Sequence, residues 1–263
     1  CCACTFTSGP IATMNITQAS APLVHDELEL LSEMLPLADQ RIVELGCGAA
    51  QLARALLARY PDSRITALEV DERQHAKDLA EPQGRSGCVA AGAQAIPAAD
   101  ASFDLALRLK SLHHVPLPLM ATALGEAARV LRPGGRLYVS EPVFDGPFNE
   151  LVRLFNDEGR VRAAAQAAVD EALRGGAWTQ VDERRFDMPV CFRSFDDFEQ
   201  RLMRPTFADH AIDDAKLATV RAAFEAHQGA DGARFTRPMH VRLPFFYGWI
   251  IVAAGFCAQM ITS

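Results

Sequence analysis

A glycine-rich turn followed at a distance by a carboxylate is the strongest chemical signal in this 263-residue chain. Residues 43–50 read V-E-L-G-C-G-A-A, and Glu69 stands 21 residues after Gly48, at the end of the next apolar run. Glycines at positions 46 and 48 let the backbone turn tightly and pass close to a ligand. A carboxylate at the end of the second strand can accept hydrogen bonds from both hydroxyls of a ribose. The spacing predicts a nucleoside site, although a G-x-G turn alone is a weak signal.

A pair of histidines is the second candidate for chemistry. His113 and His114 lie in the run S-L-H-H-V, just after the apolar segment 103–109. Neutral imidazole accepts a proton near physiological pH, so either side chain is a candidate general base toward a hydroxyl or an amine. The alternative is a structural loop in which one histidine caps and the other packs. Glu141 and Asp145 follow a later strand, where they either face an acceptor or serve as exposed or capping groups.

One basic residue and one cysteine near these motifs have open or modest roles. Arg108 needs an acidic partner if it is buried inside a sheet, or else it binds an acidic acceptor. Cys47 is expected to pack in the glycine turn rather than to act as a nucleophile. Four aromatic residues either wall an apolar acceptor pocket or belong to the core, namely Trp178, Phe192, Phe195 and Phe198.

The elements that must position these residues alternate between strand and helix. Apolar runs predict strands at 41–45, 64–70, 88–91, 103–109, 136–140, 183–192 and 234–243. Amphipathic segments predict helices at 26–36, 49–60, 71–79, 116–131, 148–174, 195–203 and 213–227, the fifth broken near Gly159. Short connections between alternating strands and helices indicate a parallel sheet covered on both faces. Ligands of such a sheet bind beyond the carboxyl ends of its strands.

Composition bounds the class of protein. The formal charge is −7, and a charged fraction of 22% with 49% hydrophobic residues is that of a globular domain. The acidic balance argues against a nucleic-acid partner, as does the absence of an N-P-P-Y-like run that could hold a flipped base. The chain has seven cysteines, three of them near its start and four scattered. This is an odd number in a chain of this size, which favours a reducing cytoplasm over a disulfide scaffold.

The two ends of the chain differ from its middle. Residues 1–13 precede the first methionine and are interpreted as a doubtful extension, and 14–243 as one domain. Cys1, Cys2 and Cys4 in the extension lack partner Cys/His pairs at zinc-finger spacing. Residues 244–263 form an uncharged apolar tail that resembles the first helix of major-facilitator transporters. It is either a truncated membrane segment, and hence a possible tether, or a buried terminal helix.

Four blocks in order resemble the class I S-adenosylmethionine-dependent methyltransferases, small-molecule branch. They are V-E-L-G-C-G at 43–48, I-T-A-L-E-V-D at 65–71, I-P-A-A-D-A-S-F-D at 96–104 with S-L-H-H-V after it, and E-A-A-R-V-L-R-P-G-G-R-L-Y-V-S-E-P at 126–142. The resemblance implies a Rossmann-like doubly wound α/β fold with a seven-stranded, mostly parallel sheet. Its last strand is antiparallel and forms an edge hairpin with the sixth.

The resemblance also implies a cofactor site. Glu44 corresponds to the acid that supports the loop and the methionine amino group, Gly46 and Gly48 to the residues along the methionine and ribose, and Glu69 to the ribose acid. The remaining expected contacts are Cys47, Val70, Gly92, Ala93, Leu109 and Lys110. The third glycine of the turn is Ala50 here, and the usual adenine-edge aspartate is Gly92, so one hydrogen bond to the cofactor is expected to be missing.

The function so implied is methyl transfer from S-adenosyl-L-methionine to a small-molecule acceptor, giving S-adenosyl-L-homocysteine. Because the cofactor carries the reactivity, no metal and no covalent nucleophile are expected. Two alternatives are weighed. A non-catalytic cofactor-binding or regulatory module of the same fold is suggested by Ala50 and Gly92. A nicotinamide-dependent oxidoreductase would want a third glycine where Gln51 stands.

Overall fold

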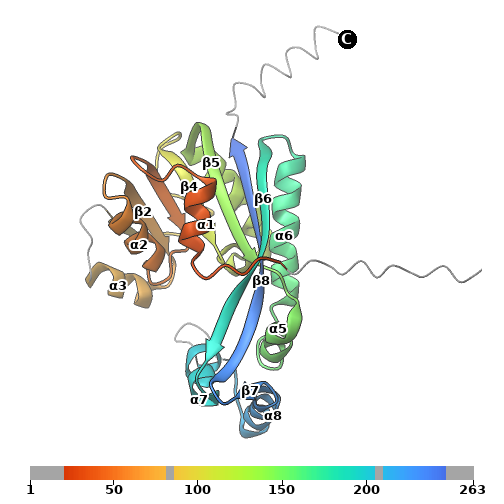
Figure 1. The fold of residues 1–263 in the computed structure, drawn as a ribbon. Coiled ribbons are helices and arrows are strands. Elements are labelled where there is room, and N and C mark those ends of the chain that lie inside the picture. Colours follow the sequence, from red (N-terminus) through yellow and green to blue (C-terminus); the bar gives the residue numbers. More distant parts are fainter. Residues whose placement is uncertain (1–20, 81–85, 205–209, 247–263) are drawn as a thin grey trace, which may run out of the picture.

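The computed structural model describes residues 21–80, 86–204 and 210–246, and Figure 1 shows their arrangement. One sheet has the strand order β3-β2-β1-β4-β5-β8-β6, with the short β7 paired to β8. The strands are β1 Arg41–Leu45, β2 Arg64–Glu69, β3 Ser86–Ala90, β4 Phe103–Leu109, β5 Leu131–Pro142, β6 Trp178–Phe192, β7 Gln228–Gly229 and β8 Gly232–Phe246. The order reverses between β1 and β4, which is where such a sheet opens a ligand site.

The direction of the strands confirms the expected α/β class. The pairs β1–β2, β2–β3, β1–β4 and β4–β5 are parallel, whereas β8 runs antiparallel to both β5 and β6. The hairpin of the last two long strands is therefore confirmed. The two-residue β7 is an eighth strand that the sequence did not indicate, because two residues carry no periodicity.

Helices cover both faces of the sheet. The α-helices are α1 Glu27–Met34, α2 Gln51–Arg59, α3 Glu72–Ala80, α4 Met120–Val130, α5 Gly146–Arg153, α6 Gly159–Arg174, α7 Phe195–Phe198 and α8 Asp214–Glu225, and the shorter turns are η1 Leu112–His114, η2 Leu117–Leu119 and η3 Glu199–Met203. Side chains of α1 and α2 share one apolar cluster with the sheet, and those of α4 and α6 share the other. These four helices each bury an apolar stripe, as their spacing requires.

Several boundaries differ from those expected from the sequence. The break predicted near Gly159 in the helical segment 148–174 is confirmed, since residues 154–158 separate α5 from α6, but α5 begins two residues earlier, at Gly146. The turn R-P-G-G at 132–135 lies within β5, where Gly134 has a φ of +87° and the pairing with β4 shifts register. Strand β8 extends through residues 244–246, beyond the predicted end of this strand at residue 243 and into the predicted apolar tail.

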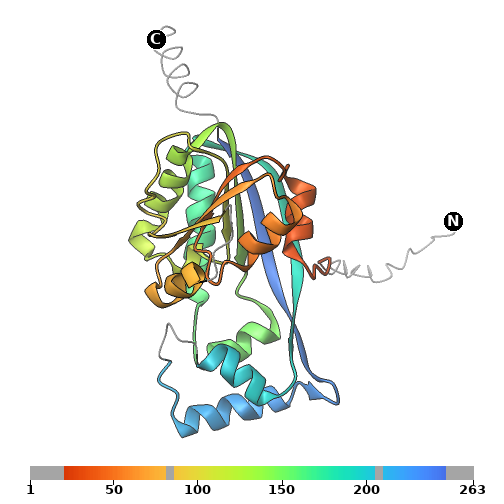
Figure 2. The ribbon, with the colours of Figure 1, turned by 90° about the vertical axis from the view of Figure 1, so that its left-hand side faces the viewer.

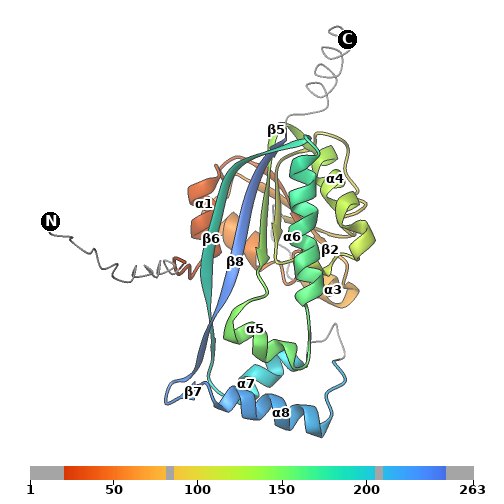
Figure 3. The same ribbon diagram turned by 90° about the vertical axis from the view of Figure 1, so that its right-hand side faces the viewer.

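The β6–β8 hairpin continues past the end of the sheet and carries a second group of helices (Figure 3). We call this group, formed by α5, α7, η3, α8 and the distal halves of β6 and β8, the distal layer. Its core is an aromatic cluster made up of Phe148, Phe155, Phe192, Phe195, Phe198, Phe224 and Phe235. Phe192 and Phe198 meet edge to face at 5.1 Å between ring centroids. Three of the four aromatic residues considered for an acceptor wall thus belong to the core.

The fourth aromatic residue, Trp178, is also a core residue. It is buried in the cluster beneath α4 and α6, with its ring 5.5 Å from that of Phe246.

Residues 1–20 and 247–263 lie outside the described ranges, and with them the predicted extension, its cysteines and most of the apolar tail. None of the helices within the described ranges combines the length and the apolar content needed to cross a bilayer.

Shortening one aromatic residue is expected to destabilise the distal layer. Phe224 has no exposed surface, so Phe224→Ala leaves a cavity and is expected to lower the free energy of unfolding by about 3–5 kcal/mol in urea titrations. Leu154→Ala is the control, because Leu154 is 40% exposed and its loss is expected to cost less than about 0.5 kcal/mol. Equal effects of the two substitutions would contradict this packing.

Candidate functional site

The glycine turn joins the end of β1 to α2 in a backbone conformation that needs glycine. Gly46 has a φ of +81°, and a Cβ added there would lie 2.9 Å from the Cβ of Ser111. Gly48 has a φ of +53°, and both glycines are exposed. The N–H groups of Gly46 and Cys47 both donate to the carbonyl of Leu68 at 3.0 Å, which ties the turn to β2. The exposed backbone of the turn is therefore accessible to a ligand at the carboxyl ends of the strands.

Glu69 lies directly against this turn. It is the last residue of β2 and is only 8% exposed, and its Oε2 accepts a hydrogen bond from the N–H of Gly48 at 2.7 Å. Its Oε1 accepts from the N–H groups of Val70 and Asp71 at 2.8 and 2.9 Å. Three backbone donors thus orient one buried carboxylate beside the two glycines. The sequence had placed these residues together from spacing alone, and the fold does bring them together.

The loop after β3 contains Gln94, a residue that no sequence pattern indicated for the site. An added Cβ on Gly92 would meet the side-chain amide of Gln94 at 2.4 Å, so this amide covers the space where an aspartate side chain would begin. Ala93 is buried in the core cluster under α4, whereas Val70 is 70% exposed. Gln94 lies two positions beyond the missing aspartate, and only the folding back of the loop places its amide at Gly92.

The end of β4 is held to its neighbours on three sides. The N–H of Lys110, a residue with a φ of +54°, donates to the carbonyl of Ser140, and its Nζ forms an ion pair of 2.6 Å with the buried Glu27 of α1. Ser111 donates its hydroxyl to the carbonyl of Leu45 at 2.6 Å. Leu109 and Cys47 pack against the cluster beneath α1 and α2. Glu44, within β1, is also buried, with an exposure of 5%.

A buried carboxylate orients the first histidine. Glu141 at the end of β5 is 2% exposed, and its Oε2 lies 2.5 Å from Nδ1 of His113. Its Oε1 accepts from the N–H groups of Ser111 and Leu112 at 3.0 and 2.6 Å. Burial alone would raise the pKa of Glu141, but these hydrogen bonds and the nearby Arg108 hold it below its ordinary value. Glu141 therefore stays a carboxylate at neutral pH and fixes the imidazole ring.

The sequence suggested that Glu141 either contacts the acceptor or is an exposed or capping group. The structure shows neither role, because Glu141 is buried and binds the histidine loop. Asp145 does cap, since its carboxylate accepts a hydrogen bond from the N–H of Gly146 at the start of α5.

Arg108 points into the interior with 1% exposure, and its Nε and Nη1 have no hydrogen-bond partner among the described residues. Burial lowers the pKa of Arg108 to about 10, and Glu141 partly counteracts that shift. Arg108 is thus a buried cation behind the histidine loop.

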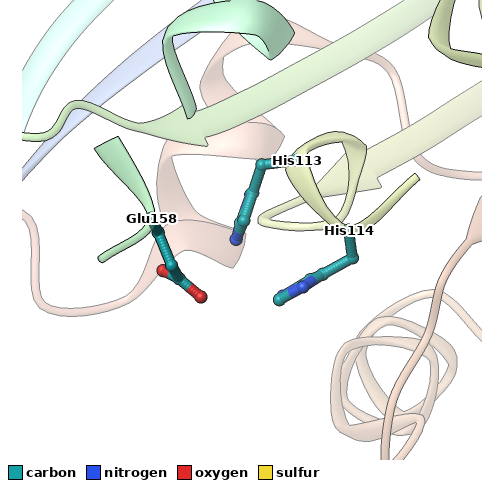
Figure 4. A group of neighbouring side chains, drawn as sticks. All are labelled: His113, His114 and Glu158. Carbon is teal, nitrogen blue, oxygen red and sulfur yellow. The ribbon is translucent and has the colours of Figure 1, made fainter. Parts of the chain in front are cut away.

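The second histidine and the carboxylate just before α6 complete the group in Figure 4. Ring centroids of His113 and His114 are 4.1 Å apart, and His114 is exposed. Glu158 precedes α6, and His113, His114 and Glu158 each present a nitrogen or oxygen atom within 4.8 Å of the others. Arg162 donates to Oε2 of Glu158 at 2.5 Å through Nη2 and to Oδ1 of Asn149 at 2.6 Å through Nη1. Glu158 is therefore held in place beside the two imidazoles.

A different cavity lies at the opposite edge of the sheet. Its volume is about 630 Å³, and it is lined by charged and polar residues at the amino ends of β1, β2 and β4, among them Arg41, Asp104 and Arg132. Asp104 pairs there with Arg41 at 3.4 Å and with Arg132 at 3.0 Å. Mutual neutralisation of these side chains and their position far from the glycine turn separate this cavity from the candidate site.

These features fit a sulfonium nucleoside at the carboxyl edge of the sheet. Exposed glycine backbone, an oriented carboxylate and the exposed apolar Val70 offer contacts for the tail, sugar and base of such a group. The third glycine missing at position 50 does not prevent the turn, because Ala50 itself adopts a φ of +50° at the start of α2.

Comparison with known proteins agrees with this geometry. The family profile described as "Methyltransferase domain" matches residues 43–139. The 27-O-demethylrifamycin SV methyltransferase of Amycolatopsis mediterranei is 38% identical over 117 residues, 42% of this chain and 42% of that protein. The O-methyltransferase cnsE of Penicillium expansum is 34% identical over 139 residues, 49% of each. The chain thus aligns with less than half the length of either relative.

The fold as a whole also matches solved structures. The protein BH2331 of Bacillus halodurans superposes with a TM-score of 0.61 at 16% identity, covering 84% of this chain and 98% of that one. This likeness concerns the fold, whereas the profile and the relatives concern the blocks that form the site. Residues 43–139 thus match a methyltransferase domain in sequence, and the chain as a whole shares its fold with that solved structure.

Proposed function

We propose that this protein transfers a methyl group from S-adenosylmethionine to an oxygen atom of a small-molecule acceptor. The observation that supports this most directly is the placement of Glu69 against Gly48 at the same sheet edge as the His113–Glu141 pair. Glu69 beside Gly48 can accept hydrogen bonds from a ribose, and the His113–Glu141 pair can accept the proton of a hydroxyl group. Both relatives described above are named for oxygen methylation.

The cofactor contacts are assigned to residues around the glycine turn. Glu69 accepts hydrogen bonds from the ribose hydroxyls. The backbone of Gly46, Cys47 and Gly48 lies along the ribose and the methionine part of the cofactor, and Glu44 supports this loop. Val70 and Ala93 flank the base, the amide of Gln94 takes the place of an aspartate beside Gly92, and the backbone of Leu109 and Lys110 meets the amino-acid end. When bound, S-adenosylmethionine supplies an activated methyl group.

The protein's own part in the reaction is alignment and removal of a proton. Because Nδ1 of His113 faces Glu141, its Nε2 is directed away from that carboxylate and is the atom that accepts the proton of the acceptor hydroxyl. The methyl group goes to the oxygen that loses this proton. His114, exposed beside it, contacts the acceptor and limits water access from the open side.

The setting assigned to this activity is the cytoplasm, with a small molecule as partner. Cys191 is a free thiol in the described part of the chain, which suits a reducing compartment. The net charge of −7 disfavours a nucleic-acid acceptor.

Removing the proposed ribose acid is expected to weaken cofactor binding. Hydrogen bonds to a charged group are worth about 1.5–3 kcal/mol, so Glu69→Ala is expected to lower the affinity for S-adenosylhomocysteine by roughly 10- to 150-fold in calorimetric titrations. Glu72→Ala, an exposed acid in the first turn of α3, is the control. An affinity of the Glu69 variant equal to that of the control would contradict the assigned site, and binding of NAD alone would favour an oxidoreductase.

The amide of Gln94 gives a second, smaller expectation. A neutral hydrogen bond contributes about 0.5–1.5 kcal/mol, so Gln94→Ala is expected to reduce the affinity for S-adenosylhomocysteine by about two- to twelvefold. The same substitution should leave the affinity for S-ribosylhomocysteine, which lacks the adenine, unchanged. A similar loss for both ligands would show that Gln94 acts on the loop and not on the base.

The histidine is tested by turnover with matched binding measurements. With S-adenosylmethionine and a panel of phenols and alcohols, His113→Asn is expected to lower the rate of S-adenosylhomocysteine release by roughly 10²- to 10⁴-fold, because the proton acceptor is lost. Its affinity for S-adenosylhomocysteine should match that of the parent protein. His25→Asn, an exposed histidine before α1, is the control. Unchanged turnover in the His113 variant would exclude it as the base.

A further inference from the structure

The group formed by His113, His114 and Glu158 has the composition of a metal site. Two imidazoles and one carboxylate are ligands that divalent first-row ions such as Zn²⁺ accept, and three protein ligands leave a coordination position open. The three ligand atoms lie within 4.8 Å of one another. In a tetrahedral site with metal–ligand bonds of about 2.1 Å, two ligand atoms are ~3.4 Å apart, so the group has to contract to bind an ion. Because His114 is exposed, rotation of its side chain can close this difference.

The surroundings of the group hold two of its members in a ligating geometry. Glu141 lies 2.5 Å from Nδ1 of His113, an arrangement that fixes the ring and leaves Nε2 to coordinate, as carboxylates do behind metal-bound histidines. Figure 4 shows the side chains of His113 and Glu158 converging, one from the loop after β4 and the other from the start of α6.

Arg162 is compatible with an ion at this position. Its hydrogen bonds to Glu158 go to Oε2, whereas Oε1 accepts a hydrogen bond from the side-chain amide of Asn156 at 3.1 Å. An ionised carboxylate offers about four lone-pair sites, so Glu158 can bind an ion and keep Arg162 as an outer partner. Arg162 is itself anchored to Asn149 of α5, which makes the carboxylate the rigid side of the site.

We propose that His113, His114 and Glu158 bind one divalent transition-metal ion. The binding itself does not depend on methyl transfer. Its consequence rests on the proposed function: an ion on Nε2 of His113 occupies the atom that otherwise takes the acceptor proton, so metal-bound and catalytically competent states exclude each other. The site would then make the activity sensitive to free zinc.

The test uses the untagged 263-residue chain in which Cys1, Cys2 and Cys4 are replaced by serine, so that their thiolates cannot bind the added ion. Calorimetric titration with ZnCl₂ is expected to show one ion per chain, and Co²⁺ should give visible d–d bands without thiolate charge-transfer absorption. Glu158→Gln and His114→Gln should each weaken zinc binding by more than about tenfold. Loss of a residue that only contacts a metal ligand already costs about that much, and loss of a ligand itself should cost more.

A matched control keeps the result specific. Glu171→Gln removes an exposed carboxylate from the same helix, α6, and should leave the titration unchanged. Absence of a one-to-one ion, or ion binding that survives both Glu158→Gln and His114→Gln, would overturn the proposal. A parallel titration with S-adenosylhomocysteine separates the two claims: loss of nucleoside binding with intact zinc binding would contradict the proposed function alone.

Discussion

A single buried carboxylate, Glu141, holds together the end of the sheet on which the candidate site depends. With only 2% of its surface exposed, it accepts hydrogen bonds from two backbone N–H groups of the loop after β4 and contacts His113. A charge this deeply buried is stable only when its lone pairs are satisfied. The loop must therefore follow β4 in one conformation, and that conformation holds Nδ1 of the His113 ring against Glu141.

The same loop also restrains the glycine turn. Ser111 donates its hydroxyl to Leu45 and lies so close to Gly46 that a side chain there would clash. Since Ser111 N–H is one of the donors to Glu141, the carboxyl ends of β1, β4 and β5 are coupled through one residue. The nucleoside side and the histidine side of the site are consequently parts of one hydrogen-bonded unit.

The distal layer adjoins this unit at the loop between α5 and α6, where Glu158 lies within 4.8 Å of the histidines. Its aromatic cluster packs α5, α7 and α8 onto the extended β6–β8 hairpin, and Arg162 links α6 to Asn149 of α5. Figure 2 shows these helices as a separate group beneath the sheet. Glu158, between α5 and α6, reaches the histidines because the predicted long helix is interrupted there. A continuous helix over 148–174 would have had no such loop.

The sequence by itself determined the sheet, the glycine turn and the partnership of Gly48 with Glu69. Each of these follows from local information: apolar periodicity, positive-φ positions that favour glycine, and strand ends that parallel pairing places on one edge.

Only the tertiary structure decided what the carboxylates and the distal residues do. Glu141 and Glu158 lie 28 and 44 or more positions from the histidines that they meet, and Gln94 covers Gly92 because a loop folds back. Such contacts are set by the packing of separate elements and by the need to satisfy buried charges, and no short sequence pattern records them.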